Sequence, residues 1–334
     1  MRHNLASLVS SLYPDKRLSQ YSFNILKAAL NLSSDILASI ILCAFFLFMT
    51  LSASHLSSGE FSIKPNIYAG FACRYLKIPY CVNIQGLGTA FQKEPIATVV
   101  TLMYKIALKK AKVVFFENQG NADEFVKRHI IAKHKETVLN GAGVNLNFYE
   151  YQPYPDEEQG IHFLFLGRIM KEKGIDELFS VAKKLKNKYG KKIVFDLVGF
   201  FEDEYKEVVE QLMADDVVIF HGFQSDPRPY YTMSHCIILP SYHEGMSNVL
   251  LEAASTGRAV ITTNIPGCKE AVDDGINGYL CKKMDIESLE VCIEKFIRLD
   301  REERKNMGIA GRQKMEKEFD KKMVVQDTLD TIEC

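Results

Sequence analysis

The sequence lacks the features of a disulfide-stapled, metal-bound or nucleic-acid-coating protein. Its eight cysteines fall singly, never as Cys-x-x-Cys, and none of its eight histidines stands at ligand spacing from a cysteine. The net charge is -1, so the basic excess expected of a protein that coats nucleic acid is missing. No apolar run starts within the first dozen residues, where a secretory signal would place one. We therefore expect reduced thiols, a cytoplasmic location and no nucleic-acid partner.

Several catalytic motifs are also missing. There is no Gly-x-x-x-x-Gly-Lys-Ser/Thr, which excludes a P-loop nucleotidase, and no Gly-x-Ser-x-Gly or His-Glu-x-x-His, which argues against esterases and zinc peptidases. Gly86-x-Gly88 and Gly141-x-Gly143 lack the third glycine of the dinucleotide fingerprint, which weakens the case for a dehydrogenase or epimerase. Without any Asp-x-Asp, a bound diphosphate must be balanced by side-chain cations, so we expect neither a metal nor a cofactor.

The length and the order of segments indicate a two-domain α/β protein. The chain has 334 residues, about twice the usual domain size, and 47% of them are hydrophobic. The stretch 149–160 is polar, contains two prolines and is the best candidate for an interdomain linker. We expect a first domain at residues 1–153 and a second at 154–318.

One segment, Ile36–Ser54, carries no charge over nineteen residues, close to the roughly 20 that cross a bilayer. Its hydroxyl side chains and its distant flanking cations weaken a transmembrane interpretation. A buried helix or helix–strand pair, a membrane-surface anchor and a spanning helix all remain open.

Elsewhere short apolar strands alternate with amphipathic helices, which is typical of parallel sheets covered by helices. The first domain has an expected strand at 111–117 between helices at 98–110 and 119–129. In the second, we expect strands at 161–167, 193–198, 217–220, 236–240 and 259–263, with helices at 175–189, 204–213, 228–234, 249–255 and 286–298. Ligands of such doubly wound sheets bind outside the carboxyl ends of the strands, so the loops there should carry the chemistry.

The loop after the strand 161–167 contains Gly167, Arg168, Lys173 and Gly174. Glycine allows a ligand close to the backbone, the guanidinium can grip two phosphate oxygens, and the ammonium is a movable point charge. Arg168 and Lys173 together suit a diphosphate. A solvated basic helix start explains the same residues equally well.

The loop after the strand 236–240 is the richest. Glu244 lies in the loop, and Glu252 follows eight residues later in a helix that Ser247 or Asn248 could cap. Gly245 to Asn248, with Met246 and Ser247 between, would expose N–H groups at a helix amino end, a site for an anion. Glu252 sits among apolar residues and needs a partner, either ligand hydroxyls or a neighbouring Lys or Arg.

A third loop, His221-Gly222-Phe223, could form the wall for a flat ring, with Gly222 offering backbone groups and Phe223 an aromatic face. By itself this is ordinary turn chemistry. No histidine is assigned a role.

Together these motifs resemble a known family. The combination of Gly167-Arg168 with Lys173-Gly174, then Glu244-x7-Glu252, and finally Gly275-x-Asn277-Gly278 is similar to that of the family-four retaining glycosyltransferases. The resemblance implies the glycosyltransferase-B fold, in which two Rossmann-like doubly wound domains face a cleft. Segments 63–68 and 83–88 resemble the branch that extends lipid-linked oligosaccharides for bacterial surface polysaccharides or glycoprotein glycans.

The resemblance also implies roles for the site residues. Arg168 and Lys173 would neutralise the donor diphosphate, Glu244 would face the donor sugar, and Glu252 would accept hydrogen bonds from the ribose. The donor would be a UDP-sugar and the acceptor a lipid-linked glycan at the inner face of the cytoplasmic membrane. The last helix, within 319–334, would return to the first domain.

The amino half departs from the family pattern. No strand with a glycine-rich loop is evident before Ser62, and Gln85 stands where many relatives have histidine. The first domain is therefore expected to be shortened or atypical. Two alternatives to a transferase stay open: a nucleotide-sugar binder without transfer activity, and a dinucleotide-dependent epimerase or dehydrogenase.

Overall fold

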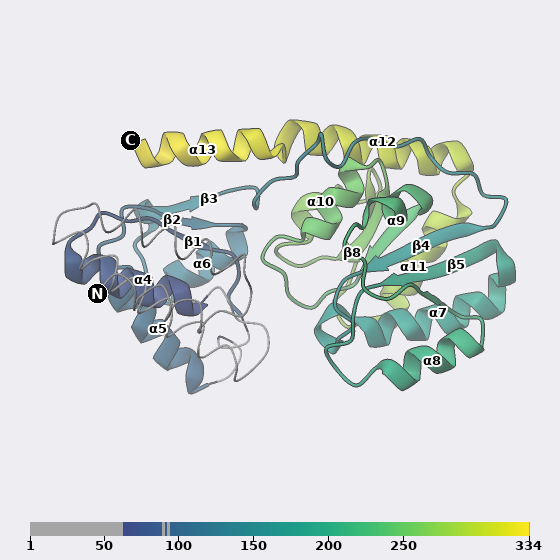
Figure 1. Ribbon diagram of the computed structural model, residues 1–334, viewed down its shortest axis with the longest axis horizontal. Helices are drawn as coiled ribbons and strands as arrows, with labels where there is room; N and C mark the ends of the chain where they lie inside the picture. The colour runs from purple at the N-terminus through teal and green to yellow at the C-terminus, as the bar shows by residue number, and fades with distance from the viewer. Residues whose placement is uncertain (1–62, 89–90, 92–93, 334) are drawn as a thin grey trace, which may run out of the picture.

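The structure is a computed structural model that describes residues 63–88, 91 and 94–333 (Figure 1). The apolar segment Ile36–Ser54 lies outside the described residues. Within these residues, two lobes are built on two separate parallel sheets, each with its own cluster of buried apolar side chains. This confirms the predicted α/β class.

The first lobe contains a three-stranded sheet in the order β1 (Val82–Ile84), β2 (Val114–Phe116), β3 (Glu136–Val138). Around it lie α4 (Ile63–Leu76), α5 (Ile96–Ala107), α6 (Gln119–Lys127) and the 3₁₀ turn η3 (Lys133–Lys135). The rings of Phe91, Tyr104, Phe116 and Phe125 pack against one another between sheet and helices, with centroids 5.1 to 6.1 Å apart. Aromatic packing thus builds this small core.

The second lobe contains a six-stranded parallel sheet in the order β6-β5-β4-β7-β8-β9. Its strands are β4 (Ile161–Leu166), β5 (Ile193–Val198), β6 (Ile219–Phe220), β7 (Cys236–Leu239), β8 (Ala259–Thr263) and β9 (Gly278–Cys281). The central strands β7 and β8 are buried along their whole length, as expected of a sheet with helices on both faces. The order reverses between β4 and β7, which creates a topological switch point.

The helices of this lobe are α7 (Ile175–Tyr189), α8 (Lys206–Ala214), α9 (Arg228–Met233), α10 (Asn248–Ser255), α11 (Ile286–Arg298) and α12 (Arg301–Glu318), with short turns η4 (Lys171–Lys173), η5 (Gly190–Lys192) and η6 (Lys269–Ala271). The long, polar α12 comes close to the backbone of the turn after α10, because Gly308 faces the carbonyl of Gly257. A Cβ at Gly308 would lie 2.1 Å from that oxygen. The absence of a side chain at Gly308 therefore allows α12 to pack directly against this turn.

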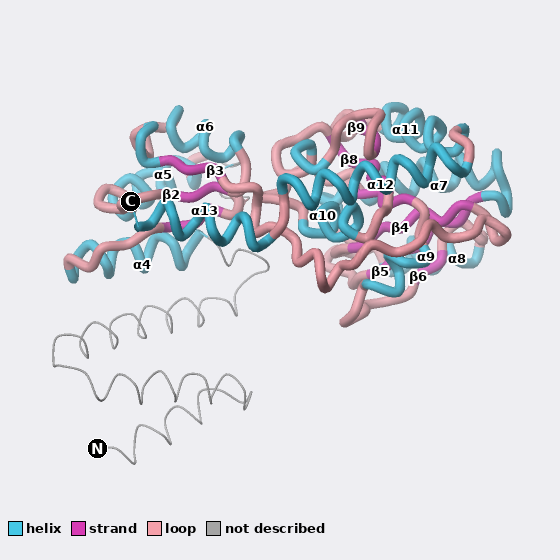
Figure 2. The backbone as a smooth tube through the Cα atoms, turned by 90° about the horizontal axis from the view of Figure 1, so that it is seen from above, coloured by secondary structure: helices cyan, strands magenta, loops and turns pink. Residues whose placement is uncertain are grey.

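The last helix, α13 (Lys321–Glu333), continues the line of α12 and passes over the three-stranded sheet of the first lobe, as Figures 1 and 2 both show. The junction is fixed by backbone hydrogen bonds: the N–H of Val144 donates to the carbonyl of Phe319, and that of Lys321 to the carbonyl of Val144. Two segments therefore connect the lobes, the linker after β3 and the α12–α13 junction.

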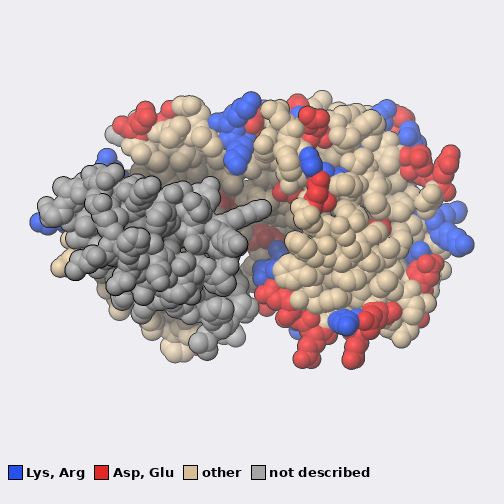
Figure 3. All heavy atoms as spheres, viewed as in Figure 1, with Lys and Arg blue, Asp and Glu red and all other residues tan. Residues whose placement is uncertain are grey.

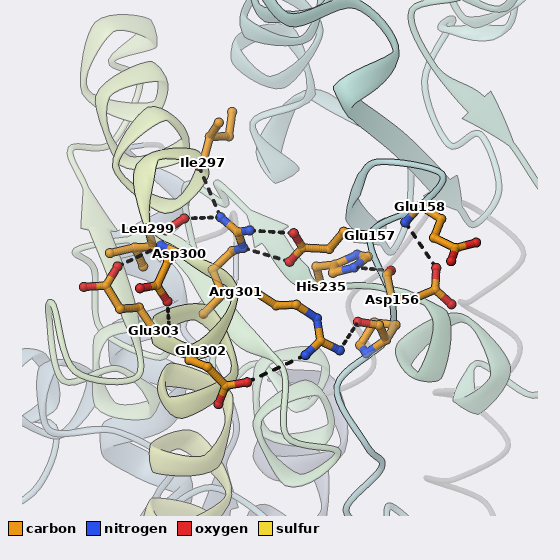
Figure 4. Close-up of polar contacts among 12 residues, drawn as sticks. Asp156, Glu157, Glu158, His235, Ile297, Leu299, Asp300, Arg301, Glu302 and Glu303 are labelled. Carbon is orange, nitrogen blue, oxygen red and sulfur yellow. Dashed lines mark hydrogen bonds and ion pairs between the residues drawn. The ribbon is translucent and has the colours of Figure 1, made fainter.

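The start of the second lobe is tied to the α11–α12 junction (Figure 4). Arg304 contacts both carboxylate oxygens of Glu157, at 3.1 and 2.7 Å, and donates to the carbonyls of Ile297 and Leu299. Asp300 caps α12 in a capping box with Glu303. Because Arg304 is almost fully buried, this paired contact fixes the linker where the second sheet begins.

In the part of the chain that the structure describes, no helix combines the length and the apolarity that a bilayer crossing demands. Figure 3 shows cations and anions interspersed over the visible face of the second lobe, in line with the near-zero net charge. No disulfide joins the six described cysteines, which are Cys73, Cys81, Cys236, Cys268, Cys281 and Cys292.

Candidate functional site

The loops singled out from the sequence share one edge of the second sheet. Because β4, β5, β6 and β7 are parallel, the segments after Leu166, Val198, Phe220 and Leu239 all leave at the carboxyl edge. The loops after β4 and β5 are in close contact: a Cβ at Gly199 would lie 1.8 Å from the carbonyl oxygen of Gly167. Because glycine has no side chain, the backbones of these two loops can lie this close together at the carboxyl edge of the sheet.

Lys173 and Glu244 meet at this edge. The Nζ of Lys173 lies 2.5 Å from Oε1 of Glu244, and the hydroxyl of Ser241 donates to the same oxygen at 2.7 Å. The two side chains are only 18% and 13% exposed. Since both contacts use Oε1, Oε2 of Glu244 is the oxygen that can accept a hydrogen bond from a ligand.

The position of Lys173 follows from the turn that carries it. Gly174 ends η4 with a φ of +69°, a left-handed conformation that favours glycine. A Cβ there would lie 2.1 Å from the carbonyl oxygen of Pro240, at the end of β7. The turn is therefore pressed against the strand that leads to Glu244, which explains why these two residues are neighbours although 71 positions separate them.

Arg168 does not share the acid partner of Lys173. Its guanidinium pairs with Glu202, in the segment after β5, and the backbone next to it bridges from Ile169 to Phe201. The sequence predicts that Arg168 and Lys173 serve one diphosphate together. In the structure each cation contacts its own carboxylate at the same sheet edge, Arg168 that of Glu202 and Lys173 that of Glu244.

Glu252 has partners that the sequence analysis did not foresee. The hydroxyl of Tyr231, in α9, donates to Oε2 of Glu252 at 2.8 Å, and Tyr149 also donates to this carboxylate. Burial raises the pKa of Glu252, and the two tyrosine hydrogen bonds oppose that shift. Protein hydroxyls, rather than a neighbouring Lys or Arg, therefore satisfy this carboxylate.

The loop after β6 presents an aromatic ring. Phe223 is 67% exposed and lies 6.0 Å, centroid to centroid, from the ring of Phe200 after β5. Gly222 has a φ of +70° and open space where a side chain would stand. Asp196, fully buried in β5, orients His221 through a 2.8 Å contact to its Nε2. Phe200 was missed because one aromatic residue in a loop gives no signal by itself.

The amino end of α10 is partly occupied by the protein itself. Ser247, one of the two predicted caps, occupies the N-cap position, but its side chain makes no capping hydrogen bond, and its own N–H donates to the carbonyl of Gly267 at 2.9 Å. The N–H of Met246 donates to the carboxylate of Glu117, and the carbonyl of Gly245 accepts from the Asn118 side chain. At least two of the N–H groups expected to meet a ligand thus already have protein partners.

Glu117 is a further site residue that the sequence did not single out. It follows β2 at the carboxyl edge of the first sheet and is 6% exposed. Burial raises its pKa to about 7, against the opposing effect of the Met246 N–H. A charged residue ending an otherwise apolar strand was the available signal, since such a group is costly to bury without a role.

The two lobes touch at this point. A Cβ at Gly245 would lie 1.9 Å from the carbonyl oxygen of Gln85, after β1, and 3.1 Å from Oε2 of Glu117. A Cβ at Gly120 would similarly meet the ring of Pro266 at 2.6 Å. The carboxyl edges of both sheets therefore face the loop that carries Glu244. Within the described residues, no group of three or more His, Cys, Asp or Glu side chains is arranged to hold a metal ion.

Known proteins share this architecture. Residues 151–314 match the family model "Glycosyl transferases group 1". HepE of Anabaena, solved with UDP, superposes with a TM-score of 0.70 at 17% identity, over 86% of this chain and 81% of HepE. Sucrose-phosphate synthase of Thermosynechococcus elongatus superposes with a TM-score of 0.65 at 19% identity, over 80% of this chain and 71% of the synthase.

Curated sequences give a consistent result. An N,N'-diacetylbacillosaminyl-diphospho-undecaprenol alpha-1,3-N-acetylgalactosaminyltransferase of Campylobacter jejuni is 26% identical, over 74% of this chain and 68% of its own length. The capsular polysaccharide biosynthesis glycosyltransferase CapM of Staphylococcus aureus is 28% identical, over 69% and 63%. The chain thus spans about two thirds of these relatives. Its second lobe matches the group 1 glycosyl transferase family, and the described part of the chain has the glycosyltransferase-B fold.

Proposed function

We propose that the protein transfers a hexosyl or N-acetylhexosaminyl unit from a UDP-sugar to a lipid-linked glycan, with retention of anomeric configuration and without a metal. The observation that carries this proposal is the largely buried Lys173–Glu244 pair at the carboxyl edge of the second sheet, opposite the first lobe. It combines a cation for phosphate with an acid for sugar hydroxyls in one place.

The donor diphosphate would bind between Lys173 and Arg168. As the bond between the anomeric carbon and the phosphate oxygen breaks, negative charge grows on the leaving group. Lys173 has three N–H donors, of which Glu244 uses one, and Arg168 has a planar fork of which Glu202 contacts one nitrogen. Both cations keep donors for phosphate oxygens, so positive charge is supplied without a metal.

The sugar and nucleoside would be held by the remaining residues. Oε2 of Glu244 would accept from a sugar hydroxyl, and the loop 245–248 would border the sugar and phosphate. The exposed Phe223, with Gly222 leaving room beside it, suits the flat face of uracil. Glu252 would accept from the ribose in exchange for a tyrosine hydroxyl.

Retention requires the acceptor hydroxyl to attack the anomeric carbon from the same face from which the leaving group departs. The new bond joins the acceptor oxygen to the anomeric carbon while the bond to the β-phosphate breaks, and the hydroxyl proton passes to the departing phosphate oxygen. The protein would contribute charge stabilisation and alignment of the two substrates between the lobes.

The choice of acceptor rests on the relatives. The printed name of the Campylobacter jejuni relative specifies an undecaprenol-diphosphate acceptor, and CapM acts in capsular polysaccharide biosynthesis. An undecaprenol-linked acceptor of this kind would be met at the inner face of the cytoplasmic membrane. The proposed partners are therefore a UDP-sugar and a lipid-linked oligosaccharide.

A panel of nucleoside diphosphate sugars, tested first by thermal shift and then by turnover with a lipid-linked acceptor, tests this function. A UDP-sugar should raise the melting temperature and be consumed, at a rate that a chelator does not change. Stabilisation without product would instead identify a binder, and stabilisation by a reduced dinucleotide alone would identify a dinucleotide enzyme. Inversion in the product would refute the retaining mechanism.

A further inference from the structure

The helix α5 of the first lobe carries apolar side chains on both of its faces. One face, formed by Ala97, Tyr104 and Ala107, is buried in the lobe. The other bears a line of side chains three or four positions apart, between 42% and 59% exposed: Ile96, Val99, Leu102 and Ile106. A helix that is apolar all round is normally covered all round. The outer line, called here the α5 stripe, therefore calls for a partner.

Basic residues lie at the carboxyl end of α5. Lys105 is in its last turn, and the exposed Lys109 follows in the turn directly after the helix. Beside it is a cavity of about 430 Å³, whose lining includes Lys105, Lys109, Lys135 and His129 and no acidic residue. The Nζ of Lys135 donates to the carbonyl of Lys109 at 2.9 Å, which holds that ammonium close to the end of the helix. The cavity thus suits an anionic group.

The end of α4 extends the same combination. The Nη1 of Arg74 donates to the carbonyl of Ile106 at 2.8 Å, so the end of α4 lies beside the end of α5. Next to Arg74 in the chain, Tyr75 is 80% exposed, and Ile78 is exposed as well. Tyrosine and isoleucine among Arg and Lys side chains are typical of surfaces that sit at a lipid–water boundary.

We propose that this face of the first lobe docks on an anionic bilayer. The α5 stripe would enter the boundary between headgroups and acyl chains, and the basic cavity would take the phosphate of a lipid headgroup. Charge complementarity favours this occupant, because an anionic bilayer offers apolar depth and a plane of negative charge directly above it. The cavity lies with the segments that precede β2 and β3, at the amino ends of these strands, away from the site at their carboxyl ends.

This inference rests on the proposed function for its biological sense, since a lipid-linked acceptor would be met at such a surface. Its test does not depend on turnover. The full chain is mixed with vesicles of phosphatidylcholine alone, or of phosphatidylcholine with phosphatidylglycerol, and the bound fraction is measured by flotation. We expect binding that needs the anionic lipid.

Two double variants separate the contributions. Val99→Gln with Leu102→Gln removes the centre of the α5 stripe, and Lys105→Gln with Lys109→Gln removes charge from the cavity. Each lysine near an anionic surface changes binding about fivefold, so the lysine variant should bind about 25-fold more weakly. The stripe variant should lose binding to at least a similar degree.

A matched control changes the same residue types on the second lobe. Lys206 and Val208 in α8 are also exposed, so Lys206→Gln with Val208→Gln should bind vesicles like the parent chain. Melting curves of all variants show whether the fold persists. Parental binding by the two α5 variants would overturn the proposal and place any bilayer contact elsewhere, residues 1–62 included.

Two further outcomes would also overturn it. If inorganic phosphate releases the protein from vesicles while Val99→Gln/Leu102→Gln binds them like the parent chain, the cavity is a site for a free anion. If that variant instead loses dimerisation, the occupant of the α5 stripe is a second copy of the chain.

Transfer to a detergent-dispersed acceptor is measured in parallel. If vesicle binding behaves as expected but no sugar is transferred, the proposed function fails and the docking face stands. If sugar is transferred but the protein does not bind vesicles, the docking face fails and the proposed function stands.

Discussion

At the scale of single residues, the Lys173–Glu244 contact is the arrangement on which the proposed chemistry depends. Replacing Lys173 by Met removes the ammonium from the leaving group while keeping most of the side chain's bulk. Losing one preorganised charge of this kind costs about 10²–10³-fold in kcat. Glu244→Gln should lower kcat/KM as well, because the amide cannot accept from the sugar and from Lys173 as the carboxylate does.

Lys171 is the matched control, because it lies in the same 3₁₀ turn but is exposed. Steady-state transfer rates should distinguish the two lysines: Lys171→Met keeps the parental kcat, and Lys173→Met does not. Equal rates for both variants would remove Lys173 from the mechanism.

Glu117 gives a prediction about stability and pH. Burial raises its pKa to about 7 in the folded protein, above the ordinary value of 4.5, so the folded state binds the proton more tightly than the unfolded state does. The stabilisation is therefore complete below about pH 4.5 and is lost as the pH rises to about 7. At 1.36 kcal/mol for each pH unit, the upper bound of this effect is about 3 kcal/mol.

Glu117→Gln removes this titration and keeps the shape of the side chain. We expect the variant to be more stable than the parent at pH 8 and to differ less at pH 5, as measured by urea unfolding at both values. The difference between the two chains isolates Glu117 from all other groups. A gap in unfolding free energy that is the same at both pH values would contradict the assignment.

At the scale of elements, sequence reasoning succeeded where local signals were strong. Ile175–Tyr189 lies between two glycines, and its helical pattern predicted both ends; Ile286–Arg298 and the strands Ile193–Val198 and Ala259–Thr263 were also predicted with their observed bounds. In each case the apolar period and the flanking residues agree. The shared position of the loops at the carboxyl edge was predicted because the strands of such a sheet are parallel.

The elements that were missed have weak local signals. The strand β1 has three residues, too few for a period to show, and β9 begins at a glycine inside a turn-like sequence. The helix α12 is polar on most of its surface, and its buried line is narrow and half glycine, formed by Met307, Gly308, Gly311 and Met315. Glu202, Tyr231 and Tyr149 could not be paired with their partners from sequence, since each contact joins distant segments.

The turn that presents Lys173 supplies a prediction at this scale. Gly174→Ala imposes a left-handed conformation on a residue with a Cβ, which costs about 1–2 kcal/mol, and also drives that Cβ to within 2.1 Å of the carbonyl oxygen of Pro240. The backbone must therefore move, and Lys173 with it. We expect a larger drop in unfolding free energy than strain alone produces, with loss of transfer.

Gly275 supplies the comparison. Its φ is +78°, but nothing lies within 4 Å of the position of its Cβ, so Gly275→Ala should show strain without a clash. Chemical denaturation of both variants gives the two free energies. If Gly275→Ala were as destabilising as Gly174→Ala, the close approach of η4 to β7 would not be what positions Lys173.

At the scale of the whole molecule, the proposed transfer requires the two lobes to meet so that donor and acceptor are aligned, and Gly245 lies where the lobes touch. Its φ is not in the left-handed region, so alanine is tolerated by its own backbone. The added Cβ would lie 1.9 Å from the carbonyl oxygen of Gln85 in the other lobe. Gly245→Ala should thus act mainly by forcing the lobes apart.

Donor binding and transfer should respond differently to that separation. Most of the proposed donor contacts come from the second lobe, so a UDP-sugar should still raise the melting temperature of Gly245→Ala. Transfer needs both lobes, and a misplacement of about 1 Å costs about 10²-fold, so kcat/KM should fall to that extent. Gly311→Ala, whose Cβ would make only an ordinary 3.4 Å contact within the second lobe, should transfer at the parental rate. Parental transfer by Gly245→Ala would mean that the lobes work without this contact, and that their relative position is set instead by the two connections at Val144 and Phe319.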